Sequence, residues 1–231
     1  VGAACNFLFS QTGQAKVSLP SVQLGPEYDN MAIAAALERR SDEVIFEEFP
    51  DVVKPAVNDL LTGKVVGFFQ GRMEFGPRAL GGRSILFHCR DKAANAWLNE
   101  RLHRTEFMPF APVTPIELAT DCYVGWTPQD RSSRFMTRTF DCTQEFAMQH
   151  PAVVHVDGTA RPQIVSQDEN GIYYRVVKAY CDESGEKALI NTSFNQHEQP
   201  INCDPADAIA SLIGNNVDVL YMENWRVLAL K

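Results

Sequence analysis

Three arginines in one glycine-rich stretch carry the most obvious chemistry in this sequence. They are Arg72, Arg78 and Arg83. The stretch, residues 71–83, separates two apolar runs, 65–69 and 84–88, that read as buried strands. Guanidinium groups bind phosphate and carboxylate oxygens in pairs, and glycines such as Gly76 allow a backbone to approach a ligand closely. The stretch therefore predicts a loop that binds phosphate or another anion, although a solvated loop with surface arginines is the alternative.

Two further polar segments follow apolar runs and are expected to join this loop. The first is the turn 157–163, which contains Arg161. The second offers hydroxyls and amides for a phosphate, base or ribose, from Asn191, Thr192, Ser193 and Asn195. Ligand sites of open α/β sheets gather where such loops meet, so we expect one site, with Arg104 adding charge from a neighbouring helix. The alternative is that Asn191 and Asn195 only close a turn.

Several common catalytic motifs are absent from the sequence. No G-x-x-x-x-G-K-[ST] phosphate loop occurs, and no serine or cysteine has the G-x-S-x-G context of a nucleophile elbow. Arginine-based positioning and charge stabilisation, with Mg²⁺ on a bound triphosphate, therefore fit better than a covalent nucleophile.

Charge is distributed unevenly along the chain. The 231 residues are 45% apolar and 22% charged, which is ordinary for a globular protein, and the net charge is −8. Residues 72–104 nevertheless contain seven lysines and arginines against three acidic residues. An acidic protein with one basic segment favours a small polyanion over a nucleic acid as partner.

Cysteine and histidine spacing predicts no metal site. The six cysteines form no C-x-x-C pair, and no two of the five histidines are four residues apart. Scattered cysteines of this kind are typical of a reducing cytoplasm. The chain has no apolar run that could span a bilayer, and it begins without a methionine or a signal peptide. We therefore expect a cytoplasmic fragment or processed piece with no membrane partner.

Apolar periodicity predicts strands that alternate with helices. Helices are expected over residues 31–39, 52–61, 91–103, 143–150, 172–180 and 204–213. Strands are expected over 65–69, 84–88, 152–156, 187–190, 217–221 and 226–230, and a mobile loop over 121–139. This alternation predicts one α/β domain with a twisted mixed β-sheet and flanking helices.

Several sequence blocks resemble those of a known family. The segment 71–85 resembles the signature of the O-carbamoyltransferases typified by nodulation protein U and the cephamycin and tobramycin enzymes. Segments 24–28, 108–112, 156–163 and 191–195 resemble further blocks of the family in the same order, although Leu102, Met108 and Glu198 depart from its pattern. The resemblance covers residues 24–231.

The resemblance implies a division of labour between two domains. Residues 1–23 would be the remnant of a missing N-terminal actin-like ATPase-fold domain, residues 24–62 a linker and helical lead-in, and residues 63–231 a YrdC-like C-terminal domain. That domain would form carbamoyl adenylate from carbamoyl phosphate and ATP, and the N-terminal domain would complete transfer to a hydroxyl acceptor.

The resemblance also implies roles for the candidate residues. Those that would neutralise the phosphates are Arg78, Arg83, Arg104 and Arg161. Those that would bind substrate or nucleotide are Arg72, Gly76, Asn191, Thr192, Ser193 and Asn195. Two rivals stay open, a non-catalytic nucleotide-binding or regulatory domain and a YrdC-like RNA-binding module, and so does the existence of a homodimer.

Overall fold

An eight-stranded mixed sheet organises the chain. The computed structural model describes residues 2–13, 21–103, 109–195 and 199–230. The strand order is β1-β10-β9-β2-β3-β8-β4-β7, in which β2 runs parallel to β9 and β4 parallel to β7, and the other neighbours are antiparallel. The strands are β1 (Val44–Glu48), β2 (Val66–Phe69), β3 (Arg83–His88), β4 (Ala111–Pro115), β7 (Gln163–Val165), β8 (Leu189–Ser193), β9 (Val219–Met222) and β10 (Trp225–Ala229). A short separate pair consists of β5 (Phe140–Asp141) and β6 (Thr159–Ala160).

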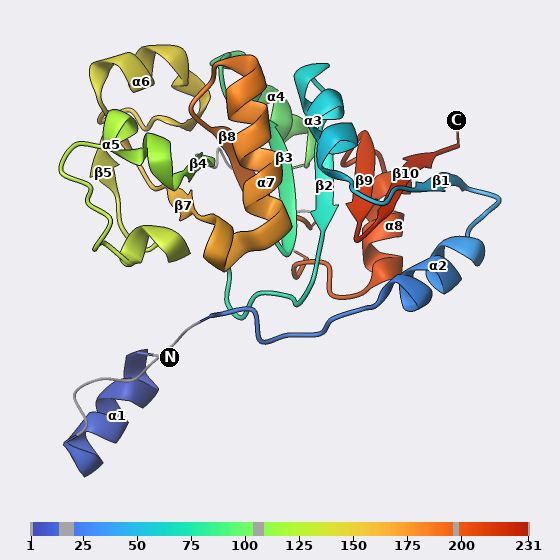
Figure 1. The fold of residues 1–231 in the computed structure, drawn as a ribbon, viewed down its shortest axis with the longest axis horizontal. Helices are drawn as coiled ribbons and strands as arrows, with labels where there is room; N and C mark the ends of the chain where they lie inside the picture. The colour runs from blue at the N-terminus through green and yellow to red at the C-terminus, as the bar shows by residue number, and fades with distance from the viewer. Residues whose placement is uncertain (1, 14–20, 104–108, 196–198, 231) are drawn as a thin grey trace.

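Helices cover both faces of the sheet (Figure 1). The helices of the described chain are α1 (Gly2–Thr12), α2 (Asn30–Glu38), α3 (Val53–Leu61), α4 (Ala93–Arg101), α5 (Ala119–Cys122), α6 (Gln144–Gln149), α7 (Gln167–Ser184) and α8 (Pro205–Ile213). Helix α1 has no buried residue and lies apart from the sheet (Figure 1). Helices α3 and α7 pack against each other on one face, and α2 and α8 lie together on the other. None of the helices in the described residues is long and apolar enough to cross a membrane.

Alternation along the central strands separates two layers of core. Val66 and Phe68 of β2 pack with residues of α3 and α7, whereas Phe69 packs with residues of α2 and α8. Every residue of β2 is buried, as expected for a strand covered by helices on both sides. The predicted mixed α/β sheet with flanking helices is confirmed.

Side-chain caps fix the helix starts that the sequence indicates. The Asp29 carboxylate accepts a hydrogen bond from the Ala32 N–H at 2.8 Å and begins α2. Asp204 and Asp207 form a capping box at the start of α8, with Pro205 at its first turn. Both helices therefore begin where the capping signals predict.

One predicted strand is wrong, and three strands of the eight-stranded sheet, β1, β4 and β7, had no predicted strand. Residues 152–156 form no strand, because Pro151 opens a 3₁₀ turn, Pro151–Val153, and Val156 is fully exposed. The segment 121–139 includes the 3₁₀ helix Ser132–Phe135 and a buried Trp126 whose Nε1 donates to Ser133, so it is a packed connection. The edge strand β1 pairs with β10 and had no predicted counterpart.

A buried carboxylate ties α3 to the strands β9 and β10. Asp59, 6% exposed, accepts hydrogen bonds from the Tyr221 hydroxyl at 2.6 Å and from Arg226 Nε at 2.8 Å. Lys64 Nζ donates to its other oxygen at 2.7 Å. Although burial disfavours the ionised form, the bonds from Arg226 and Lys64 hold the pKa of Asp59 below its ordinary value.

Asp59→Ala should lower the free energy of unfolding by about 3 kcal/mol, because it leaves buried donors without their acceptor. Asp182→Ala is the matched control, since Asp182 pairs with Lys178 on the exposed face of α7 and such pairs contribute less than about 1 kcal/mol. Urea denaturation of both variants measures the difference. Equal losses would contradict the structural role of Asp59.

Candidate functional site

Several strand ends meet at one edge of the sheet, next to the connection between β2 and β3. The sheet register pairs Ser84 with Ser193 and Ala111 with Asn191. Gln163 begins β7 alongside β4 at the same edge. The register therefore brings the three polar segments that were predicted to form one site close together.

A pocket at this edge is lined by residues from all three segments. Its polar lining includes Arg78, Arg161, Asn191, Thr192 and Ser193. Phe110 and Met136 supply part of its apolar wall. The structure thus assembles five of the predicted site residues around one cavity.

Arg78 and Arg161 bring positive charge to this pocket, whose described lining contains no acidic residue. Neither guanidinium forms an ion pair within the part of the chain that the structure describes. Burial lowers the pKa of Arg161, and the adjacent positive charge of Arg78 lowers it further. Two guanidinium groups that repel each other, with no carboxylate to balance them, favour an anion at this position.

The carboxylate of Glu74 organises the loop that carries Arg78. Its Oε1 accepts hydrogen bonds from the backbone N–H groups of Leu80 at 2.7 Å, Gly82 at 2.5 Å and Arg83 at 3.2 Å. The side chain is only 3% exposed. One oxygen therefore gathers three donors of an irregular segment, and this fixes the turn that presents Arg78.

Arg83 lies under the same loop and is fully buried. Its hydrogen bonds all go to backbone carbonyls at 2.8–3.3 Å, those of Pro26, Gln70, Gly71 and Gly82. Its guanidinium carbon also lies 3.5 Å from the centre of the Phe69 ring. Burial lowers the pKa of Arg83, which the Glu74 carboxylate opposes. Phosphate binding by Arg83 stays a prediction, and its geometry favours a positioning role.

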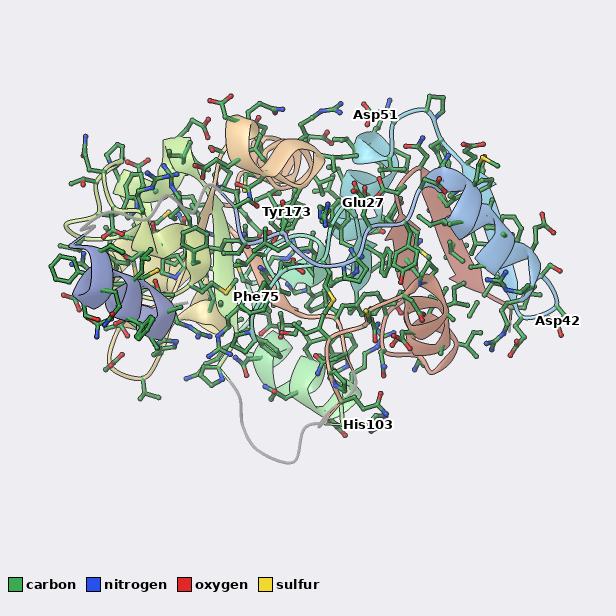
Figure 2. All side chains as sticks on the ribbon, turned by 90° about the horizontal axis from the view of Figure 1, so that it is seen from below. Glu27, Asp42, Asp51, Phe75, His103 and Tyr173 are labelled. Atoms are coloured by element: carbon green, nitrogen blue, oxygen red, sulfur yellow. The ribbon has the colours of Figure 1, made fainter. Side chains whose placement is uncertain are left out.

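Two glycines are required where the loop returns to β3. Gly81 has φ +108°, and a Cβ there would lie 2.5 Å from the Tyr173 ring. A Cβ on Gly82 would lie 2.7 Å from the Arg72 carbonyl oxygen. Seen from below, Tyr173 and Phe75 lie in the central part of the molecule, whereas His103 lies at its margin (Figure 2). Gly81 therefore allows the loop to pack closely against α7, and Gly82 allows the loop to pass close to its own backbone.

Three further predicted residues, Arg72, Gly76 and Asn195, are not among the residues that line the pocket. Arg72 is exposed, and its Nη2 donates to the Leu24 carbonyl at 3.5 Å. Gly76 is exposed with φ +132°. Asn195 Nδ2 donates to the Gln199 carbonyl at 2.7 Å, so it contributes to closing a turn. Arg104 lies outside the described residues.

Gln163 and Glu74 were not among the predicted site residues. Gln163 is fully buried, and its Nε2 donates to the Leu80 carbonyl at 3.0 Å. Its Oε1 accepts from Asn191 Nδ2 at 2.7 Å and from the Tyr173 hydroxyl at 3.3 Å. The only available signal for Glu74 was a single acid among arginines and glycines, and Gln163 gave none.

One buried cluster has the composition of a metal site, and two of its side chains are linked by hydrogen bonds to the backbone. The ligand atoms of Cys89, His150 and Glu186 lie within 4.8 Å of one another. The Lys187 N–H donates to His150 Nε2 at 3.1 Å, so the ring proton of neutral His150 is on Nδ1, which lies 3.5 Å from Cys89 Sγ. Burial also raises the pKa of the Cys89 thiol well above its ordinary value, and the thiol donates to the Ala188 carbonyl. The thiol, the His150 ring and the Lys187 N–H thus form a hydrogen-bonded chain within the protein.

Fold and pocket together define an α/β domain with a cationic pocket at one sheet edge. The chain belongs to the carbamoyltransferase family, because the family model for the carbamoyltransferase C-terminus matches residues 57–228. The resemblance found in the sequence is therefore confirmed.

Curated relatives agree with this assignment. The chain is 33% identical over 221 residues to an uncharacterized protein of Methanocaldococcus jannaschii. The alignment covers 94% of this chain and 42% of that protein. It is 33% identical to nodulation protein NolNO of Sinorhizobium fredii, covering 98% of this chain and 34% of that protein. It is also 33% identical to nodulation protein U of Rhizobium tropici, in an alignment that covers 90% of this chain and 34% of that protein. The chain thus spans well under half the length of these relatives.

Solved structures share the fold at lower identity. The crystal structure of full-length HypF in the phosphate- and nucleotide-bound form matches with a TM-score of 0.53 and 20% identity, covering 78% of this chain and 22% of that one. The crystal structure of T. kodakarensis HypF matches with a TM-score of 0.53 and 16% identity, and the match covers 81% of this chain and 22% of that one. At these identities the likeness concerns the fold.

Glu74→Gln should lower the free energy of unfolding by about 2 kcal/mol, because it removes the charge that three buried N–H groups share. Glu117→Gln is the control, since Glu117 is exposed and its carboxylate accepts one bond, from the Tyr174 hydroxyl. Denaturant unfolding of both variants provides the measurement. A loss in Glu74→Gln no greater than in the control would rule out this role.

His150 should make stability depend on pH. Burial and then the charge of Lys187 lower its pKa to about 4. The unfolded chain binds a proton near pH 6.5 while the folded chain stays neutral, so stability is lost as pH falls from about 6.5 to 4, by roughly 3 kcal/mol. His150→Phe should flatten this part of the curve of unfolding free energy against pH. An unchanged curve in that variant would assign the dependence to other groups.

Proposed function

We propose that this domain forms carbamoyl adenylate from carbamoyl phosphate and ATP, for transfer to a hydroxyl acceptor by the rest of the full-length protein. The observation that carries the proposal is the pair Arg78 and Arg161, which line the pocket beside Ser193 with no carboxylate among the described lining residues. Membership of the carbamoyltransferase family supports the carbamoyl group as the unit transferred. The phosphate- and nucleotide-bound form of HypF supports phosphate and nucleotide as ligands of this fold.

The chemistry requires water as well as the two phosphates. Water displaces the phosphoryl group of carbamoyl phosphate and leaves carbamate and inorganic phosphate. A carbamate oxygen then attacks the α-phosphorus of ATP, the bond from that phosphorus to the bridging oxygen breaks, and pyrophosphate leaves. Charge moves between phosphate oxygens in both steps, so fixed cations that neutralise it are the main catalytic requirement.

The described residues can meet this requirement. Arg78 and Arg161 would bind the phosphate oxygens, and Ser193 would donate from its hydroxyl to a phosphate or carbamoyl oxygen. Glu74 and Arg83 would act through the loop by holding Arg78 in place. Among the described residues the pocket lining contains no carboxylate, so Mg²⁺ would be carried by the phosphates of ATP and would offset their charge there.

The test is carbamoyl-phosphate-dependent ATP–pyrophosphate exchange by the full-length protein. Arg78→Ala and Arg161→Ala should each lower kcat/KM for exchange by about 10²- to 10³-fold, because each removes a cation from the developing charge. Arg175→Ala is the matched control, since Arg175 pairs with Asp51 on the exposed surface of α7 and should leave exchange unchanged.

Two outcomes would replace the proposal. ATP binding without any exchange would indicate a non-catalytic nucleotide-binding domain. A salt-dependent complex with RNA, together with absent exchange, would indicate an RNA-binding module.

A further inference from the structure

The orientation of the Asn191 amide is fixed by its surroundings. Asn191 Nδ2 donates to the Ala79 carbonyl at 3.0 Å and to Gln163 Oε1 at 2.7 Å. Gln163 is itself oriented by its Nε2 bond to the Leu80 carbonyl. Two backbone carbonyls therefore determine which end of each amide is oxygen and which is nitrogen.

This orientation leaves one acceptor without a donor. Both protons of Asn191 Nδ2 are used, and within the described residues its Oδ1 is buried and accepts no hydrogen bond. The residue is 2% exposed and lines the pocket with Arg78 and Arg161. Buried acceptors are nearly always paired in folded proteins, so an unpaired one in a ligand pocket points to a donor on the ligand.

The pocket otherwise presents side chains that donate. The guanidinium groups of Arg78 and Arg161 can only donate, and the hydroxyl of Ser193 can rotate to do so. Asn191 Oδ1 can only accept. A ligand that suits this lining has several oxygens and one amino group, which is the pattern of a carbamoyl group next to phosphate.

We propose that Asn191 selects the carbamoyl group by accepting a hydrogen bond from its amino group. The inference rests on the proposed function and adds a specificity determinant to it. An acetyl group has a methyl in place of the amino group, so it would leave Asn191 Oδ1 buried and unpaired. Sites that hydrogen-bond a polar group reject analogues lacking it far more strongly than apolar pockets reject a missing methylene.

The test compares carbamoyl phosphate with acetyl phosphate in ATP–pyrophosphate exchange by the full-length protein. Wild type should prefer carbamoyl phosphate by at least about 100-fold in kcat/KM. Asn191→Leu keeps the side-chain size but removes the acceptor, so this preference should fall at least about tenfold. If Asn191→Leu fails to fold, the ratio of kcat/KM for carbamoyl phosphate to that for acetyl phosphate is measured in Asn191→Ser and Asn191→Ala instead.

Asn95→Leu on α4 is the matched control. Asn95 is also a buried asparagine, but its Nδ2 donates to the Ala152 carbonyl and its Oδ1 accepts from Asn99, so its amide is satisfied within the protein. Its substitution should lower thermal stability and leave the preference unchanged.

The outcomes separate the two levels of inference. Equal loss of exchange with both acyl phosphates in Asn191→Leu, or no loss with either, would overturn the role of Asn191 while the proposed function stood. No exchange by wild type with either substrate would overturn the proposed function and this role with it.

Discussion

The backbone of the loop between β2 and β3 cannot satisfy its own hydrogen bonds, and two buried charged side chains do so instead. Glu74 accepts from three N–H groups of the loop, and Arg83 donates to carbonyls on both sides of it. Neither side chain is more than 3% exposed. Buried charges of this kind persist only when hydrogen bonds compensate their lost hydration, so the loop and its two charges require each other.

Two arginines of the same motif therefore have different surroundings, one inside the protein and one at the pocket. Arg83 uses its hydrogen bonds on backbone carbonyls inside the protein, whereas Arg78 has no partner in the described residues and lines the pocket. The same residue type is suitable for both positions because the guanidinium combines five donors with a permanent charge. A count of arginines therefore overstates the charge that a ligand would meet.

The sequence predicted five strands of the sheet, the main helix starts and the loops that converge, because each depends on local signals. Capping by Asp29 and Asp204 and alternation around Phe68 act over a few residues. The strand β1 was not predicted because its alternation of apolar and polar residues is weak and its Glu47 and Glu48 are exposed at the sheet edge. The different burial of Arg78 and Arg83 could not be predicted, since it depends on contacts with Pro26, which lies far away in the sequence.

The loop is also anchored by segments from both ends of the chain. The Gly71 N–H donates to the Glu223 carboxylate at 2.5 Å, in the turn between β9 and β10. On the other side, the Met73 N–H donates to the Pro26 carbonyl at 2.9 Å and the Phe75 N–H to Val22 at 2.7 Å. These anchors, together with Glu74, hold the loop on either side of residues 76–78.

Residues 76–78 are therefore an exposed bridge between fixed points. A cation carried on such a bridge has its backbone position determined before a ligand arrives, so less conformational entropy is lost when phosphate binds. The anchored backbone also explains why two glycines, Gly81 and Gly82, lie at the β3 end of the loop. Gly82 lies where the loop passes close to its own backbone, and Gly81 where it meets Tyr173. The motif is thus a structural unit in which most residues build the frame and Arg78 is the part left facing the pocket.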